Sequence, residues 1–204
     1  PNAQLKNKRV LLRADLNIPR ARDGEIINDF RLKELLPTIE LIKKKGGKII
    51  LLSHCGRPSK SSPQLSTKIF EKWFIANDHE AVFAKNLKNA LTLSKKDNNS
   101  LVILENLRFF PGEKNRDKSF AKDLSGLGDY YVNDAFALTH RNDTSITLLP
   151  ELFDKKNRTT GLLIEKEITI LNQLIENIKH PFIVIQGGIK GETKLSILSS
   201  LLKK

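Results

Sequence analysis

The scarcity of cysteine and of long apolar runs excludes several classes of protein. The 204 residues contain one cysteine, Cys55, so no disulfide forms within the chain, as is typical of the reducing cytosol. No run approaches the roughly 18 consecutive apolar residues that a membrane-spanning helix needs. The first residues, PNAQLKNKR, lack the apolar stretch of a secretory signal. We therefore expect a cytoplasmic chain that contacts no membrane.

Aromatic residues are also scarce, which bears on the meaning of the positive charge. The net charge is +12, whereas aromatic residues make up only 6%. Three interpretations are open: nucleic-acid binding, a small anionic substrate held by clustered arginines, or solvated lysines. Many lysines stand in pairs at expected helix ends, where the helix dipole favours a cation in any case. Because no nucleic-acid-binding motif or aromatic platform occurs, we expect no nucleic acid as a partner.

Apolar runs of strand length alternate with segments of helical period. Pro37 is expected to start or kink the first helix, and Gly46 and Gly47 to end it. This alternation predicts an α/β fold with a parallel sheet between two layers of helices. Strands are expected at residues 9–15, 48–53, 81–84, 101–104 and 130–132, and helices at residues 30–45, 65–75 and 119–127.

The pattern changes after Arg158. An amphipathic helix is expected at residues 161–178, and His180 and Pro181 end it. A strand at residues 182–185, a glycine turn and a helix at residues 192–203 follow. This last unit has no second strand of its own, so its strand is expected to belong to a different sheet.

Polar residues follow the expected strands. In parallel α/β sheets, ligands bind outside the carboxyl ends of the strands. An arginine fork at such a position suits phosphate or carboxylate, and a glycine nearby lets the backbone approach a ligand. The residues placed there are Asp15, Asn17, His54, Arg57, Glu105, Arg108, Asn133 and Asp134, with Arg141 soon after.

Each of these segments also has a purely structural interpretation. Asp15 and Asn17 are common in turns. Arg108 would pair with Glu105 or Glu113, and Asn133 or Asp134 would cap a helix. Taken singly, none of the segments identifies a ligand.

A glycine-rich turn, GGIKG, occurs at residues 187–191. A turn that leads from a strand into a helix can present backbone N–H groups to phosphate. The turn is neither a Walker A motif nor the dinucleotide fingerprint, because the spacing of its lysines and glycines differs from both. On its own it predicts only the start of a helix.

In this order, the segments resemble those of phosphoglycerate kinases. The matching stretches run from about Lys8 to the last residue, with a divergent stretch between about Ser59 and Ser100. They are KRVLLRADLNIP, INDFRLKELLPTI, LLSHCGRP, ILENLRFFPGE, GDYYVNDAF, THR, GLLIEKE and PFIVIQGGIKGETK.

The resemblance implies two Rossmann-like domains joined by a helix. The phosphoglycerate-binding domain would occupy residues 1–160 and the interdomain helix residues 161–178. Residues 179–204 would be the truncated start of the nucleotide-binding domain. The family's reaction is reversible phosphoryl transfer between 1,3-bisphosphoglycerate and ADP, giving 3-phosphoglycerate and ATP, with Mg²⁺ bound through the nucleotide. A full-length member is expected to be monomeric.

The resemblance also implies roles for individual residues. Arg31 and Lys194 would be catalytic, stabilising the transferred phosphoryl group, since positioning and charge stabilisation dominate such transfers. The substrate would be held by Asp15, Asn17, Arg31, His54, Arg57, Arg108 and Arg141. The nucleotide phosphates would be held by Gly187, Gly188, Lys190 and Lys194. No residue is expected to bind a metal directly.

The sequence departs from the family pattern in two places. Around Arg141 the run is ALTHRND instead of GTAHRAH, so Asp143 brings an anion towards the expected anion site. The family's later nucleotide-binding segments have no counterpart, so this chain is expected to bind ADP or ATP weakly or not at all and to be inactive alone. The alternatives are a non-catalytic basic module for nucleic acid or other polyanions, and a merely structural α/β domain.

Overall fold

The computed structural model describes residues 4–21, 24–96, 101–176, 182–183 and 185. The chain divides into two compact units, Pro1–Ile164 and Glu165–Lys204. The first unit contains the sheet and the candidate site. Among the described residues, no helix combines the length and the apolar character that crossing a bilayer requires.

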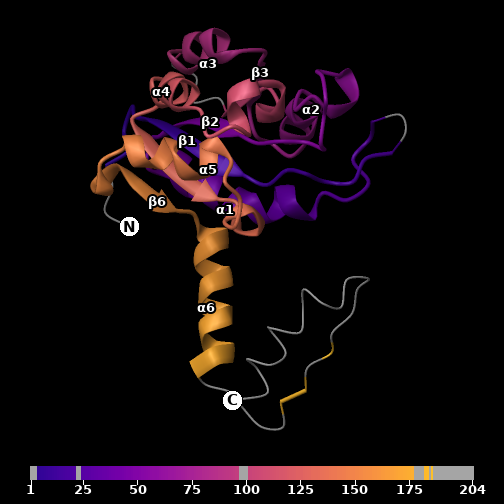
Figure 1. Cartoon of the computed structure of the whole chain (residues 1–204), viewed down its shortest axis with the longest axis vertical. Helices are drawn as coiled ribbons and strands as arrows, with labels where there is room; N and C mark the ends of the chain where they lie inside the picture. The colour runs from indigo at the N-terminus through magenta and orange to yellow at the C-terminus, as the bar shows by residue number, and fades with distance from the viewer. Residues whose placement is uncertain (1–3, 22–23, 97–100, 177–181, 184, 186–204) are drawn as a thin grey trace. The chain divides into compact units, whose positions relative to one another are not determined.

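A six-stranded sheet forms the centre of the first unit (Figure 1). Its order is β3-β4-β2-β1-β5-β6, and every neighbouring pair is parallel. The central strands are apolar over almost their whole length, as strands covered on both faces have to be. The predicted α/β fold with a parallel sheet is confirmed. The strands are β1 (Arg9–Ala14), β2 (Lys48–Leu52), β3 (Ala81–Ala84), β4 (Leu101–Leu104), β5 (Tyr130–Asp134) and β6 (Arg158–Thr160).

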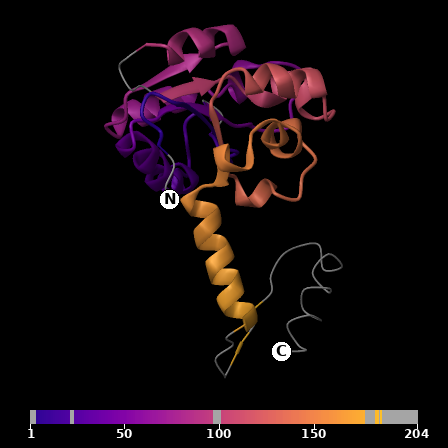
Figure 2. The same ribbon diagram turned by 90° about the vertical axis from the view of Figure 1, so that its left-hand side faces the viewer.

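Helices cover both faces of this sheet, as the alternation along β1 requires. Val10 and Leu12 pack in one apolar core, whereas Leu11 packs in the other. Residues of α1 (Phe30–Lys44) and α2 (Ile69–Ala76) belong to the first core, and residues of α3 (Leu87–Ser94) and α4 (Lys118–Ser125) to the second. Figures 1 and 2 show α3 and α1 on opposite sides of the strands.

Helix α1 illustrates how local sequence sets the boundaries. Pro37 lies inside the helix, so the helix does not start there. At its end, Gly46 has a φ of 74°, and its N–H donates to the carbonyl of Lys43 at 2.8 Å. Glycine adopts this left-handed conformation without strain, which confirms the predicted helix end.

Several elements differ from the sequence-based expectation. Helix α2 begins at Ile69, four residues later than expected, and the expected first residue, Leu65, belongs to a short 3₁₀ turn over Pro63–Leu65. Helix α3 was not predicted, although Asn86 caps it by accepting a hydrogen bond from Asn89 N at 2.9 Å. The short α5 (Thr144–Thr147) and the short edge strand β6 were not predicted either.

Helix α6 (Leu162–Glu176) begins on a buried carboxylate. Asp134 Oδ1 accepts from Ile164 N at 3.1 Å, while Asp134 Oδ2 accepts from Thr38 Oγ1 at 2.6 Å. A Cβ on Gly161 would lie 2.3 Å from the Asp134 carboxyl carbon, so only glycine fits beside this cap. Burial raises the pKa of Asp134, and these hydrogen bonds oppose that rise.

The last predicted elements fall mostly outside the described residues. Phe182, Ile183 and Ile185 are described and are not part of a strand, so the predicted strand at 182–185 is not seen there. The glycine turn at 187–191 and the helix at 192–203 lie outside the described residues.

Candidate anion-binding site

The loops after β1, β2 and β4 are tied together around Gly56. Asn17 Oδ1 accepts from Gly56 N at 2.8 Å, and the Arg108 guanidinium donates to the Gly56 carbonyl. Gly56 has a φ of 63°, and a Cβ there would lie 2.7 Å from Leu65 Cδ2. The glycine after β2 therefore allows the close approach of backbone and side chains that the sequence suggested.

Arg13, at the end of β1, lies wholly buried beneath these loops. Its Nε donates to Ser145 Oγ at 2.8 Å, and its Nη2 lies 3.2 Å from His54 Nδ1. A guanidinium only donates, so His54 Nδ1 accepts and the ring hydrogen of the neutral imidazole is on Nε2. Arg13 thereby fixes the tautomer of His54 and leaves it one N–H donor.

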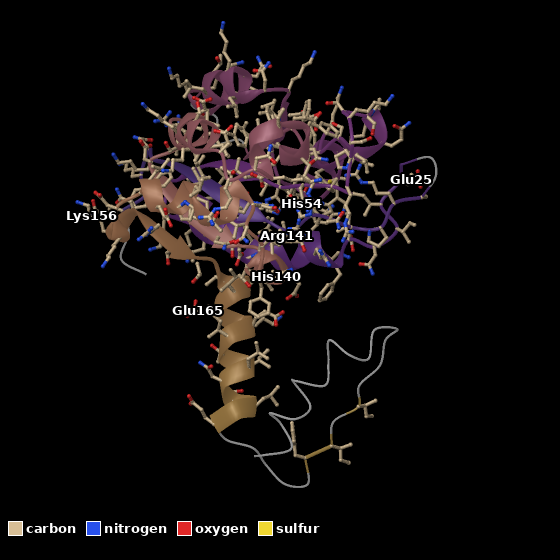
Figure 3. The ribbon with its side chains drawn as sticks, viewed as in Figure 1. Glu25, His54, His140, Arg141, Lys156 and Glu165 are labelled. Atoms are coloured by element: carbon tan, nitrogen blue, oxygen red, sulfur yellow. The ribbon has the colours of Figure 1, made fainter. Side chains whose placement is uncertain are left out.

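His54 is neutral because of where it lies. Burial is the largest cause that lowers its pKa, to about 2. The remaining causes are the nearby positive charges of Arg13, Arg108, Arg141 and Arg31. These arginines come from several segments of the chain, and Figure 3 shows His54 and Arg141 close together.

A buried carboxylate completes the layer below the site. Glu113 accepts from Ser145 Oγ at 2.6 Å and from Ser145 N at 3.0 Å, and it lies 3.9 Å from Arg13 Nη2. Burial raises the pKa of Glu113, and the charge of Arg13 opposes that rise. Tyr131 donates to the Ser145 carbonyl at 2.7 Å. We call Arg13, Glu113, Ser145 and Tyr131 the floor of the site.

Two further arginines meet at Asp143. Arg141 Nε donates to Asp143 Oδ2 at 2.8 Å, and Arg108 Nη2 lies 4.0 Å from the same oxygen. The Arg108 side chain is 3% exposed, and its Nε is the one buried side-chain polar atom without a partner among the described residues. Burial is the largest cause that lowers the pKa of Arg108, and the charge of Arg141 adds to it.

The outer part of the site is solvated. Arg31 pairs with Asp15, and the Arg31 side chain is 45% exposed. Asp15 Oδ1 also accepts from Asn17 N at 3.1 Å. Arg57 is exposed in the same loop as His54. We call Asn17, Arg31 and Arg57 the rim of the site.

Most of the predicted binding residues lie together. The structure brings Asp15, Arg31, His54, Arg108 and Arg141 into one cluster, and Asn17 joins it through Gly56. Arg57 follows Gly56 in the chain, and its side chain is exposed. The predicted nucleotide-binding residues, Gly187, Gly188, Lys190 and Lys194, lie outside the described residues.

The structural alternatives for two segments are also decided. Arg108 pairs with neither Glu105 nor Glu113, since Glu105 accepts from Ser66 Oγ at 2.9 Å and Glu113 from Ser145. Asp134 does cap a helix, although the helix is α6 and not the segment that follows it in sequence.

Sequence reasoning missed the floor. Arg13 stands between Leu12 and Ala14 in an apolar strand. A charged residue in a strand that is buried on both faces could have indicated a functional or paired position. No sequence pattern indicated Glu113 and Ser145, because these two residues lie 32 positions apart in the chain and come together only in the folded structure.

Comparison with known proteins identifies the family. The family model described as phosphoglycerate kinase matches residues 1–204. The chain belongs to the phosphoglycerate kinase family. A phosphoglycerate kinase of Akkermansia muciniphila is 38% identical over 210 residues, covering 98% of this chain and 50% of the relative. One of Coprothermobacter proteolyticus is 34% identical over 208 residues, covering 100% and 52%.

Solved phosphoglycerate kinases share the fold. The crystal structure from Pyrococcus horikoshii OT3 superimposes with a TM-score of 0.84 at 33% identity, covering 99% of this chain and 51% of that one. The structure from Coxiella burnetii gives a TM-score of 0.83 at 31% identity. The chain thus spans about half the length of the phosphoglycerate kinases that it matches.

The described residues of this phosphoglycerate kinase family member contain no group of three or more His, Cys, Asp or Glu side chains suited to a metal ion. The side chains gathered at the site are mostly hydrogen-bond donors, as an anion would require. Guanidinium groups offer forked donors, and His54 adds a neutral donor to them.

Proposed function

We propose that the cluster around His54 binds 3-phosphoglycerate or 1,3-bisphosphoglycerate. The observation that carries this proposal is that Arg108 and Arg141 meet at one buried carboxylate, while Arg108 also donates to the backbone two residues after His54. A phosphate monoester has about −1.5 to −2 charges at neutral pH, and a glycerate carboxylate adds one more. Several guanidinium groups in a partly desolvated site match that charge and its planar oxygen pairs.

The described residues divide the work of binding between them. Arg108 and Arg141 supply inner donors, and His54 Nε2–H supplies a donor that adds no charge. Arg31, paired with Asp15 at the edge, is the group proposed to stand nearest the transferred phosphoryl group. Asp15 and Asn17 offer oxygens to a substrate hydroxyl while they shape the loop.

For the whole reaction, we propose reversible phosphoryl transfer between 1,3-bisphosphoglycerate and ADP. Arg31 and Lys194 would stabilise charge on the transferred group, and Gly187, Gly188 and Lys190 would face the nucleotide phosphates. Mg²⁺ carried by the nucleotide would neutralise charge between its phosphates. A polypeptide of these 204 residues is proposed to bind phosphoglycerate without turnover, which a coupled assay tests directly.

Calorimetric titration with 3-phosphoglycerate tests the binding proposal. Arg31→Ala should weaken binding by about tenfold or more, because a charge-assisted contact is lost. Arg9→Ala is the matched control: Arg9 pairs with Asp129 at the other end of β1, so its loss should leave the affinity unchanged. An oligonucleotide that binds more tightly than 3-phosphoglycerate, with Arg31→Ala without effect on either ligand, would favour the basic-module alternative.

A further inference from the structure

We propose that Asp143 is a built-in counter-ion of the anion site, which a bound ligand has to displace from the site arginines. The inference rests on the proposed function and concerns how tightly that site binds. The Asp143 carboxylate accepts from Arg141 Nε at 2.8 Å and from Arg141 Nη2 at 3.5 Å. It also lies 4.0 Å from Arg108 Nη2, and both carboxylate and guanidinium are almost wholly buried.

The contacts of Asp143 separate it from the other carboxylates near the site. Glu113 is fixed by two hydrogen bonds from Ser145, and Asp15 Oδ1 accepts from the backbone of its own loop. Asp143 is the N-cap residue of α5, yet its side chain makes no capping hydrogen bond. Among the described residues, its carboxylate pairs with Arg141 and Arg108.

Arg108 shows that this pairing leaves donors unused. One of its terminal nitrogens donates to the Gly56 carbonyl, and the other reaches Asp143 only at 4.0 Å. Its buried Nε has no partner among the described residues. A buried unpaired N–H costs free energy. An anion that accepts a hydrogen bond from Arg108 directly therefore stabilises this guanidinium more than Asp143 does.

A resident carboxylate changes the binding of ligands according to their charge. An incoming phosphate has to compete with Asp143 for Arg141 and is also repelled by it at short range. The repulsion grows with the charge of the ligand, so Asp143 weakens the binding of a dianion more than the binding of a monoanion. The carboxylate thus offsets part of the positive charge of the site and lowers the affinity of the site for the most highly charged ligands.

The test compares three variants by calorimetry, with inorganic phosphate and with 3-phosphoglycerate as probes at low salt. Asp143→Asn keeps the shape and removes the charge, and should tighten the binding of both ligands by about tenfold or more, since the repulsion between the carboxylate and the bound anion is lost. Asp143→Glu keeps the charge and should stay close to wild type. Asp123→Asn, at an exposed position of α4, makes the same change in net charge away from the site and should have no effect.

The outcomes separate the two proposals. Equal or weaker binding of both probes by folded Asp143→Asn overturns the counter-ion role and leaves the proposed function standing. Failure of 3-phosphoglycerate to bind any variant, with phosphate still tightened by Asp143→Asn, overturns the proposed function and supports the counter-ion.

A measurement on the unmodified chain decides the matter if Asp143→Asn does not fold. In an NMR titration with phosphate, the Arg141 Nε–H signal should shift strongly, because its acceptor changes from Asp143 to the ligand. An unmoved Arg141 signal at phosphate saturation would contradict the proposal. The Arg9 Nε–H signal, from a pair with Asp129, serves as the internal reference.

Discussion

The floor and the rim of the proposed anion site both contain arginine but differ in how far their charges are buried. In the floor, Arg13 and Glu113 are wholly buried, and Ser145 connects them. At the rim, Arg31 is 45% exposed and Arg57 is exposed as well. Buried charges are costly once they lose a partner, whereas exposed ones are screened by water. We therefore expect the floor to determine folding stability, and we propose that the rim contributes to ligand binding.

The largest effect on stability is expected when the positive charge of Arg13 is removed from the floor. Arg13→Met should lower the free energy of unfolding by about 3–5 kcal/mol, because it leaves Glu113 buried without its cation and His54 Nδ1 without its donor. Urea denaturation measures the change. The matched control Arg9→Met removes a half-exposed pair in the same strand and should cost at most about 1 kcal/mol. Equal losses in the two variants would show that the floor contributes no more than a surface pair.

The neutral state of His54 provides a test by pH. Below the ordinary pKa of 6.5, His54 is protonated in the unfolded chain, whereas in the folded chain it stays neutral down to about pH 2. Stability from this residue is therefore complete above pH 6.5 and is lost as the pH falls. Relative to His54→Gln, the wild type should lose up to about 1.4 kcal/mol per pH unit between pH 6 and 4. Parallel pH profiles of unfolding for both proteins would contradict the neutral, buried histidine.

A smaller change in the floor is to remove the hydroxyl that links its two charges. Ser145→Ala should cost about 1–2 kcal/mol, because Arg13 Nε and Glu113 Oε1 each lose a buried partner. Ser125→Ala, which removes a hydroxyl near the end of α4, should stay within about 0.5 kcal/mol. Thermal and urea unfolding of both variants gives the comparison. A cost for Ser145→Ala no greater than for Ser125→Ala would mean that water replaces the hydroxyl.

The smallest effect on stability is expected at the rim. Arg57→Ala should change the free energy of unfolding by less than about 0.5 kcal/mol, since its side chain is exposed. Its loss should nevertheless weaken 3-phosphoglycerate binding by about threefold, a value typical of a solvated charge near a ligand. Denaturation and calorimetry on the same sample measure both. A large loss of stability with unchanged binding would reverse the roles assigned to the two regions.

The sequence was sufficient for the five strands from β1 to β5 but not for the edge strand β6 or for every helix that covers the sheet. Strands with continuous apolar runs, such as Leu101–Leu104, were predictable because burial on both faces leaves an unmistakable pattern. The edge strand β6 was not, since Arg158, Thr159 and Thr160 are partly or fully exposed and show no such pattern. Helix α5 was missed because four residues are too few to display helical periodicity.

The candidate site was predictable where residues follow strands. His54 and Arg108 lie at strand ends, and the rule for parallel sheets brings them together without knowledge of any distance. The partners that control them could not be predicted in the same way. Whether Arg108 turns to Glu113 or to Asp143 depends on how α5 packs, which is a property of the tertiary structure.

The order of the sheet also affects when the site comes into existence. Its groups follow β1, β2, β4 and β5, and β1 lies between β2 and β5 in the finished sheet. Parallel pairings between strands distant in sequence form slowly during folding. Because a ligand that binds only the native state shifts the equilibrium by mass action, added phosphate should stabilise the fully assembled sheet and no partly paired precursor. In a refolding experiment, the time at which phosphate first binds the chain would therefore report when β5 pairs with β1.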